Sequence, residues 1–132
     1  MLYALLCYDS EETVGAWTKE QDDMAMAKLQ LCTDKLASQG RLGPVARLMT
    51  TKRATTVRKG RESMVIDGPF AETKEQLLGF FIVDCATLEQ AIETAKELGL
   101  ASSSTGAYEI RPLSVFQPGL HGIAASPAIP SP

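Results

Sequence analysis

A carboxylate, an aromatic ring and several charges follow one another in one short segment, Asp67-Gly68-Pro69-Phe70-Ala71-Glu72-Thr73-Lys74-Glu75. Asp67 comes directly after the apolar residues Met64-Val65-Ile66, which predicts that it ends a strand. An aspartate there can act as a general base, or as a hydrogen-bond acceptor for a ligand. It can instead accept hydrogen bonds from nearby backbone amides and only fix the turn. The sequence leaves both interpretations open.

The residues after Asp67 suit either interpretation. Gly68 permits backbone conformations closed to other residues, and the proline that follows disfavours helical geometry there, so the turn is expected to be rigid. Phe70 can plug the core or stack against a ligand. Glu72 and Lys74 belong to a charged loop that is either simply solvated or rims a cleft. The ligand-binding hypothesis uses Gly68, Pro69, Phe70, Glu72 and Lys74 together.

Three residues on other segments are candidates for the same cleft. Tyr3 and Tyr8, in the first apolar run, could donate hydrogen bonds to a ligand or to Asp67. Arg111 alternates with apolar residues near the end of the chain. It is therefore expected to be solvated, to pair with Asp67 or Glu72, or to meet an anionic ligand.

Basic residues gather within ten positions, and they have two interpretations. They can protect the edges of a hairpin, or they can form a docking patch for an anion or a protein. Aromatic residues are not interleaved with them, which disfavours binding of single-stranded nucleic acid. The net charge of −3 also disfavours a general nucleic-acid binder. The cluster consists of Lys52, Arg53, Arg58, Lys59 and Arg61.

Metal, cofactor and nucleophile chemistry have little support in the sequence. The single histidine, His121, lies in a proline-rich terminal segment, and Cys7, Cys32 and Cys85 are too far apart for a zinc or redox motif. Each cysteine lies among apolar residues, so buried, reduced thiols are expected. No phosphate-binding glycine loop or nucleophile elbow is present. We therefore expect no metal site and no cofactor.

The composition is that of one soluble domain. The chain has 132 residues, of which 45% are hydrophobic and 22% charged. It shows no secretory leader pattern and no apolar run of membrane-spanning length, so a cytoplasmic protein is expected.

Periodicity predicts alternating strands and helices. The first helix is expected over residues 19–38, beginning after the capping box Thr18-x-x-Gln21 and ending at Gly40. The second is expected from the capping box at Thr87 to Gly99. The predicted strands are Leu2–Tyr8, Pro44–Thr50, Ala54–Arg58, Ser63–Ile66, Leu78–Asp84 and Tyr108–Leu113. Residues 117–132 are expected to form a loose or domain-swapped tail.

This order predicts an α+β fold in which two helices cover one face of a mostly antiparallel sheet. The central strands are apolar at consecutive positions, so the face without helices also needs cover. A second copy of the chain is the simplest cover, and a homodimer is therefore expected.

Four segments resemble the YCII-related family, in its DGPF-domain branch. The residues 67–75 carry the resemblance most specifically, and Met1–Tyr8, Ala54–Arg58 and Tyr108–Leu113 extend it. The resemblance covers residues 1 to about 116. It implies a ferredoxin-like domain that pairs into a dimeric α+β barrel, with a cleft near the signature. It implies little about chemistry, because most members have no assigned activity.

Three functional hypotheses follow. In the first, a small dimeric protein binds a small-molecule ligand near Asp67–Phe70, with acid-base chemistry by Asp67 as the only catalysis the residues suggest. Some relatives are thought to use a His-Asp pair, which the body of this chain lacks, so binding is favoured over turnover. In the second, the resemblance suggests a regulatory partner of an extracytoplasmic-function sigma factor. In the third, the dimer is purely structural. The sequence identifies no substrate.

Overall fold

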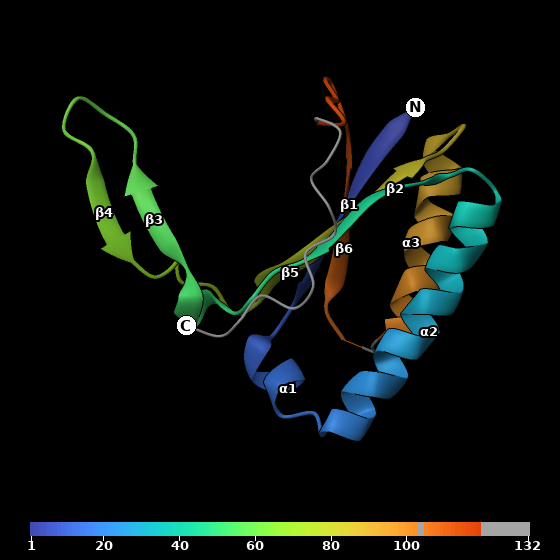
Figure 1. The fold of residues 1–132 in the computed structure, drawn as a ribbon, viewed down its shortest axis with the longest axis horizontal. Helices are drawn as coiled ribbons and strands as arrows, with labels where there is room; N and C mark the ends of the chain where they lie inside the picture. The colour runs from blue at the N-terminus through green and yellow to red at the C-terminus, as the bar shows by residue number, and fades with distance from the viewer. Residues whose placement is uncertain (103–104, 120–132) are drawn as a thin grey trace.

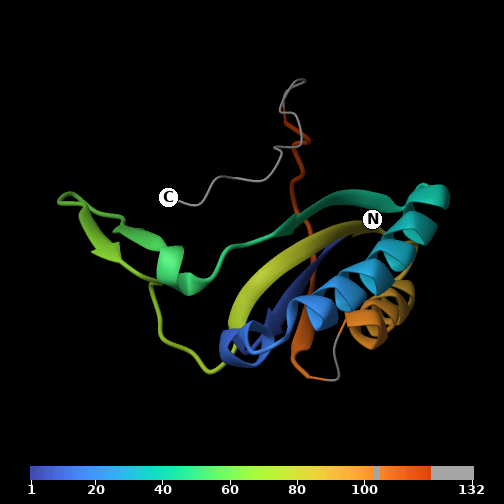
Figure 2. The same cartoon turned by 60° about the horizontal axis from the view of Figure 1, so that its bottom comes forward.

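The computed structural model describes residues 1–102 and 105–119, and it is built on one antiparallel sheet. The strand order is β2-β5-β1-β6. Two long helices, α2 (Lys19–Ser38) and α3 (Leu88–Ser102), lie on one face of this sheet (Figures 1 and 2). The architecture confirms the predicted α+β class with a ferredoxin-like arrangement. The strands are β1 (Leu2–Asp9), β2 (Leu42–Arg47), β5 (Gln76–Asp84) and β6 (Ala107–Pro112).

Helix α2 begins and ends where the sequence predicted. The Thr18 hydroxyl accepts a hydrogen bond from the Gln21 amide at 3.1 Å, and the Gln21 side chain accepts one from the Thr18 amide at 2.9 Å. These two bonds satisfy amides that have no partner inside the helix. Gly40 follows the helix with a φ of 67°, a left-handed conformation that glycine adopts without strain.

The predicted end of the second helix is wrong. Helix α3 continues past Gly99 to Ser102. Gly99 has an ordinary helical conformation, and Tyr108 lies beside it on the neighbouring strand. A glycine inside a helix costs about 1 kcal/mol relative to alanine. Leu98 before it is fully buried, whereas Leu100 after it is 87% exposed, so the burial of Leu98 alone offsets that cost.

The alternation of strand β1 divides its side chains between the two faces of the sheet. Tyr3 and Leu5 are buried beneath the helices, where they meet Phe81, Val83 and Leu98 in the core. The opposite face, which we call the open face, has no helix over it among the described residues (Figure 2). The register places on it Ala4, Leu6 and Tyr8 of β1, Phe80 and Ile82 of β5, and Glu109 and Arg111 of β6.

The predicted hairpin is confirmed, and it stands apart from the main sheet. Strands β3 (Thr55–Arg58) and β4 (Met64–Asp67) pair only with each other. Together with the short helix η1 (Thr51–Arg53) and the connecting segments they project from the body (Figure 1). We call residues 48–75 the arm.

Two local features differ from the sequence prediction. A short helix, α1 (Glu11–Gly15), follows β1, capped by the Ser10 hydroxyl, which accepts a hydrogen bond from the Thr13 amide. Five residues are too few to show an apolar stripe, so the pattern missed it. Strand β2 spans Leu42–Arg47, and not Pro44–Thr50 as predicted. It is an edge strand with an irregular register between Leu42 and Val45, and such a strand accommodates proline.

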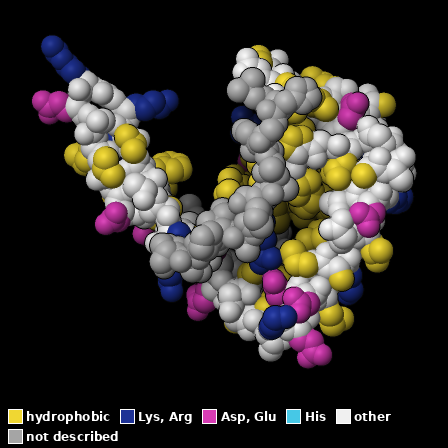
Figure 3. Space-filling model, viewed as in Figure 1, with side chains coloured by type: hydrophobic (Ala, Val, Ile, Leu, Met, Phe, Trp, Pro, Cys, Tyr) yellow, Lys and Arg dark blue, Asp and Glu magenta, His cyan; other side chains and the backbone are white. Residues whose placement is uncertain are grey.

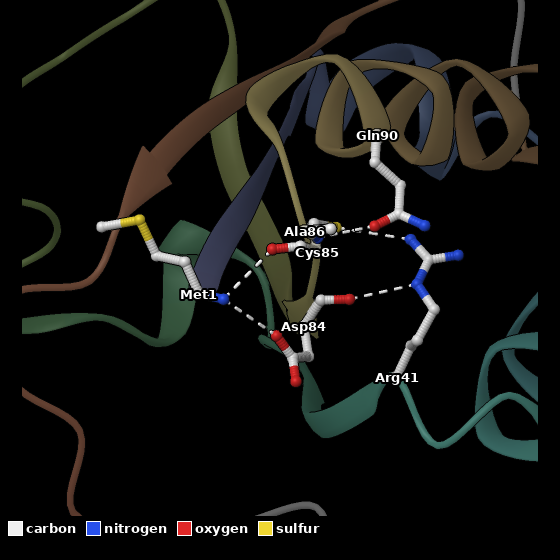
Figure 4. A network of polar contacts seen from close by, with 6 residues as sticks. All are labelled: Met1, Arg41, Asp84, Cys85, Ala86 and Gln90. Atoms are coloured by element: carbon white, nitrogen blue, oxygen red, sulfur yellow. Dashed lines mark hydrogen bonds and ion pairs between the residues drawn. The ribbon is translucent and has the colours of Figure 1, made fainter.

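A polar network joins the start of β2 to the end of β5 and to α3 (Figure 4). The Arg41 guanidinium donates to the Asp84 carbonyl at 3.0 Å and to the buried Thr94 hydroxyl at 2.7 Å. The ammonium of Met1 donates to the Asp84 carboxylate and to the Cys85 carbonyl, both at 3.1 Å. These bonds tie three elements together at one end of the sheet.

Among the described residues, no helix has the length and apolar character needed to cross a membrane. The predicted terminal tail lies outside the described residues from residue 120 onward, and so does His121.

Candidate functional site

The turn after Asp67 is held by backbone groups and a threonine. Gly68 has a φ of 101°, which favours glycine at this position. Its amide donates to the Ala54 carbonyl at 2.8 Å, and its carbonyl accepts a hydrogen bond from the Thr56 hydroxyl at 2.8 Å. The turn is therefore fixed without help from the Asp67 carboxylate.

The Asp67 side chain is exposed, and no described residue forms a hydrogen bond or ion pair with its carboxylate. Thr55 lies opposite Asp67 in the hairpin, and Val57 lies opposite Val65. Since side chains alternate along a strand, Asp67, Val57 and Val65 share one face of the hairpin. The carboxylate thus stands beside an apolar pair, available to a group outside the arm.

Phe70 does not plug the core of its own chain. Its side chain is 76% exposed, although the residues before it, Gly68 and Pro69, are partly buried. Glu72 and Lys74 are also exposed, and their segment has no helical turn. Lys74 borders a cleft between α1 and the base of the arm, which Glu12, Thr51 and Thr73 also line. The loop therefore rims a depression, while Phe70 points its ring at solvent.

Helix α1 anchors the base of the arm. Both carboxylate oxygens of Glu11 accept hydrogen bonds from the Thr51 amide, at 2.8 and 3.2 Å. The Glu11 amide in turn donates to the Gln76 side chain at 2.9 Å, at the start of β5. These contacts connect α1 to both the outgoing and the returning segment of the arm.

The candidate residues on the main sheet fall on opposite faces. Tyr3 is buried in the core beneath the helices, with 6% of its surface exposed. Tyr8 and Arg111 lie on the open face, where the Tyr8 hydroxyl is 3.5 Å and the Arg111 guanidinium 3.9 Å from the carboxylate of Glu109. Tyr3 and Tyr8 therefore cannot serve one cleft. Figure 1 shows that β1 and β6 stand apart from β4, so Asp67 does not meet Tyr8 or Arg111 of its own chain.

Glu109 is the member of the open-face cluster that the sequence analysis missed. It is two residues from Arg111 in a strand, which puts both side chains on the same face. The same alternation that singled out Arg111 also identifies Glu109.

Burial changes the acidity of three groups on the helix side of the sheet, and one of them is the Cys32 thiol of α2, whose pKa it raises. Burial also raises the pKa of the Cys7 thiol, and it raises the pKa of the Tyr108 hydroxyl, whose hydrogen-bond partners are Ser102 and Cys7. Cys7, Cys32 and Cys85 are all free thiols, and Cys85 is fully buried. The Cys7 and Cys32 thiols and the Tyr108 hydroxyl are therefore neutral near pH 7. Within the part of the chain that the structure describes, no three His, Cys, Asp or Glu side chains are grouped so that they could hold a metal ion.

Comparison with known proteins gives a family and one uncharacterized relative. The sequence matches the YCII-related domain family over residues 1–117. An uncharacterized protein of Rhizobium meliloti (strain 1021) is 52% identical over 120 residues, which cover 90% of this chain and 97% of that protein.

Proposed function

The chain belongs to the YCII-related family, and from that premise we propose that it is a ligand-binding homodimer whose cleft is completed by the arm. The arm of one subunit lies against the open face of the other. Asp67, Gly68, Pro69 and Phe70 then close a cleft, with Tyr8 and Arg111 of the partner subunit as its floor. Glu72 and Lys74 rim the cleft.

One observation carries this proposal: the arm projects from the body with its apolar side chains exposed. Val57, Val65 and Phe70 are 59%, 66% and 76% exposed. An isolated two-stranded hairpin is marginally stable in water, and grouped apolar side chains on a surface mark an interaction site. Figure 3 shows hydrophobic side chains along the arm, away from the main body. On the open face, Leu6 and Phe80 are partly exposed and offer apolar side chains to such a contact, whereas Ala4 and Ile82 are already buried.

Asp67 has the properties of a ligand acceptor in this arrangement. The turn does not use its carboxylate, which therefore accepts a hydrogen bond or a proton from the ligand. Phe70 supplies apolar contact. A single carboxylate without a partner base is a weak catalytic apparatus, so binding is the proposed activity, and acid-base chemistry by Asp67 is its natural extension.

A second function, docking to an extracytoplasmic-function sigma factor, is favoured by the charge on the arm. Lys52, Arg53, Arg58, Lys59 and Arg61 are all exposed, and within the described ranges none of them forms an ion pair. Unpaired positive charges on a projecting element suit an acidic protein surface. Pull-down of a co-encoded sigma factor tests this, with binding lost when Lys52, Arg53 and Arg58 are changed to alanine.

The primary test combines oligomeric state with ligand screening. Sedimentation should give a dimer, and a small-molecule library should contain compounds that raise the melting temperature of the wild type and not of Asp67→Ala. Glu62→Ala, which removes another exposed carboxylate of the same hairpin, is the control and should respond like the wild type. A monomer in solution, or equal responses of wild type and Asp67→Ala, would overturn the proposal.

A further inference from the structure

A second hollow lies on the helix side of the sheet, away from the open face. Its volume is about 250 Å³, and it is half enclosed between α2, α1 and the sheet. Figure 3 looks onto this region, where hydrophobic side chains gather between the sheet and the helices. The residues that matter to the argument are Cys7, Trp17, Met26, Leu29, Phe81 and Tyr108.

The buried side chains of α2 are Ala25 and Leu36, and neither of them lines the hollow. The residues of α2 that line it are Met26, Leu29, Gln30 and Thr33. The hollow therefore lies beside the middle of the helix, between its two buried residues. On the other side of the opening, Arg47 of β2 donates to the Asp22 carboxylate of α2 at 3.1 Å. This ion pair holds the helix and the edge strand at a fixed separation.

The walls are aromatic and apolar, and the charges beside them are already engaged. The rings of Phe81 and Tyr108 are 6.1 Å apart between centroids. The buried Asp9 carboxylate accepts hydrogen bonds from the Ser10 amide at 2.8 Å and the Thr105 hydroxyl at 3.1 Å. Arg47 is paired with Asp22. A charged ligand would enter without a free counter-charge and lose its hydration, which is costly.

The volume sets the size of the occupant. A dry apolar cavity of about 150 Å³ holds one benzene molecule, and pockets for drug-sized ligands begin at about 300 Å³. A hollow of about 250 Å³ lies between these two and suits one or two rings. The Tyr108 hydroxyl and the Cys7 thiol in its wall provide weak polar contacts for one substituent.

We propose that this hollow is a second binding site, which takes a neutral, mostly apolar molecule of one or two rings. It is independent of the cleft that the arm completes, because Cys7 and Tyr8 point to opposite faces of the sheet. The two sites can therefore be occupied and mutated separately.

Trp17 makes the proposal directly measurable, because it is the single tryptophan of the chain and lies in the wall of the hollow. Nitrobenzene, a neutral ring that quenches tryptophan fluorescence, should quench Trp17 with a saturable dependence on concentration. 4-Nitrobenzoate, the same ring with a carboxylate, should quench only in proportion to its concentration. Bound nitrobenzene should also slow the alkylation of Cys7 and leave that of Cys32 unchanged.

Two valine substitutions locate the binding. Val45→Phe places a ring in the hollow from the edge strand, and it should weaken nitrobenzene binding by about tenfold or more. Val115→Phe makes the same change at an exposed position after β6, outside the lining of the hollow, and should bind as the wild type does. Val14→Phe, which fills the hollow from α1, is a second filling variant should Val45→Phe fold poorly.

The proposal would be overturned if, in the wild type, quenching of Trp17 by both compounds rose linearly with their concentration and did not saturate. Saturable binding that survives both filling variants in folded protein would overturn it too, since the ring would then sit elsewhere. Equal saturable binding of 4-nitrobenzoate would refute the neutral class of ligand. Asp67→Ala should leave the binding of nitrobenzene unchanged, because Asp67 belongs to the arm. An error in the proposed arm cleft and an error in the proposed hollow site therefore give different results.

Discussion

The Glu11 carboxylate accepts a hydrogen bond from the Thr51 amide at 2.8 Å, and this bond joins α1 to the base of the arm. A carboxylate that receives a backbone amide forms a stronger hydrogen bond than a neutral acceptor does. Glu11 therefore determines how firmly the arm is held to the body.

Glu11→Ala should loosen the base of the arm. Losing a hydrogen bond to a charged group costs about 1.5–3 kcal/mol, so the amides of residues 50–54 should exchange with deuterium about tenfold faster. Glu12→Ala removes the exposed neighbouring carboxylate and should leave exchange unchanged. Equal exchange in the two variants would show that Glu11 does not anchor the arm.

Val65→Asp should convert the proposed dimer into monomers. The change puts a charge at the centre of the apolar face that Val65 shares with Val57, and burying an unpaired charge at an interface costs several kcal/mol. Sedimentation velocity measures the result. Leu31→Asp, at a similarly exposed apolar position on α2, should remain dimeric. If both variants dissociate, or neither does, the arm is not the contact.

Arg41→Ala should lower the free energy of unfolding by about 2 kcal/mol in urea titrations, because hydrogen bonds contribute about 1 kcal/mol each. Its guanidinium donates to the Asp84 carbonyl (Figure 4) and to the buried Thr94 hydroxyl, and both lose a donor. Arg53→Ala removes an exposed arginine of the arm and should change stability by less than about 0.5 kcal/mol. If both variants lose a similar amount of stability, the loss of positive charge is the cause, and the hydrogen bonds of Arg41 are not.

The Cys7 thiol should react slowly with iodoacetamide in the folded protein. Burial raises its pKa, so at pH 8 a smaller fraction is thiolate than in the unfolded chain. Mass spectrometry of the Cys7 peptide measures the alkylation rate in the folded and in the unfolded chain. The difference between these two rates should become smaller as the pH rises through the raised pKa of the folded protein. The chain unfolded in urea is the control. Equal rates at pH 8 would contradict the burial of this thiol.

The elements with the clearest local signals were predictable from the sequence. The capping box at Thr18 and the glycine at position 40 mark both ends of α2. The apolar run in β5 marks a central strand. The predicted end of α3 was wrong because a glycine is the usual signature of a helix end, and here Gly99 lies inside the helix, which continues to Ser102.

The candidate site was less predictable, because its parts depend on where elements lie in space. Local pattern placed Asp67 at the end of a strand, and the structure confirms that position. Nothing local indicates that β3 and β4 leave the sheet, which separates Asp67 from the tyrosines of β1. Trp17 has no periodic neighbours to reveal it, and the hollow that it lines is formed by residues of α1, α2, β2 and β5 that lie far apart in the sequence.

The arm connects β2 to β5, two strands that are already neighbours in the sheet. The Leu48 amide bonds to the Leu78 carbonyl at 2.8 Å, so the outgoing chain meets the returning chain at the sheet edge before the arm begins. A short connection across that point would leave the four strands and their core unbroken. Lengthening or trimming the segment should therefore alter the surface that the arm presents and leave the four-stranded sheet intact.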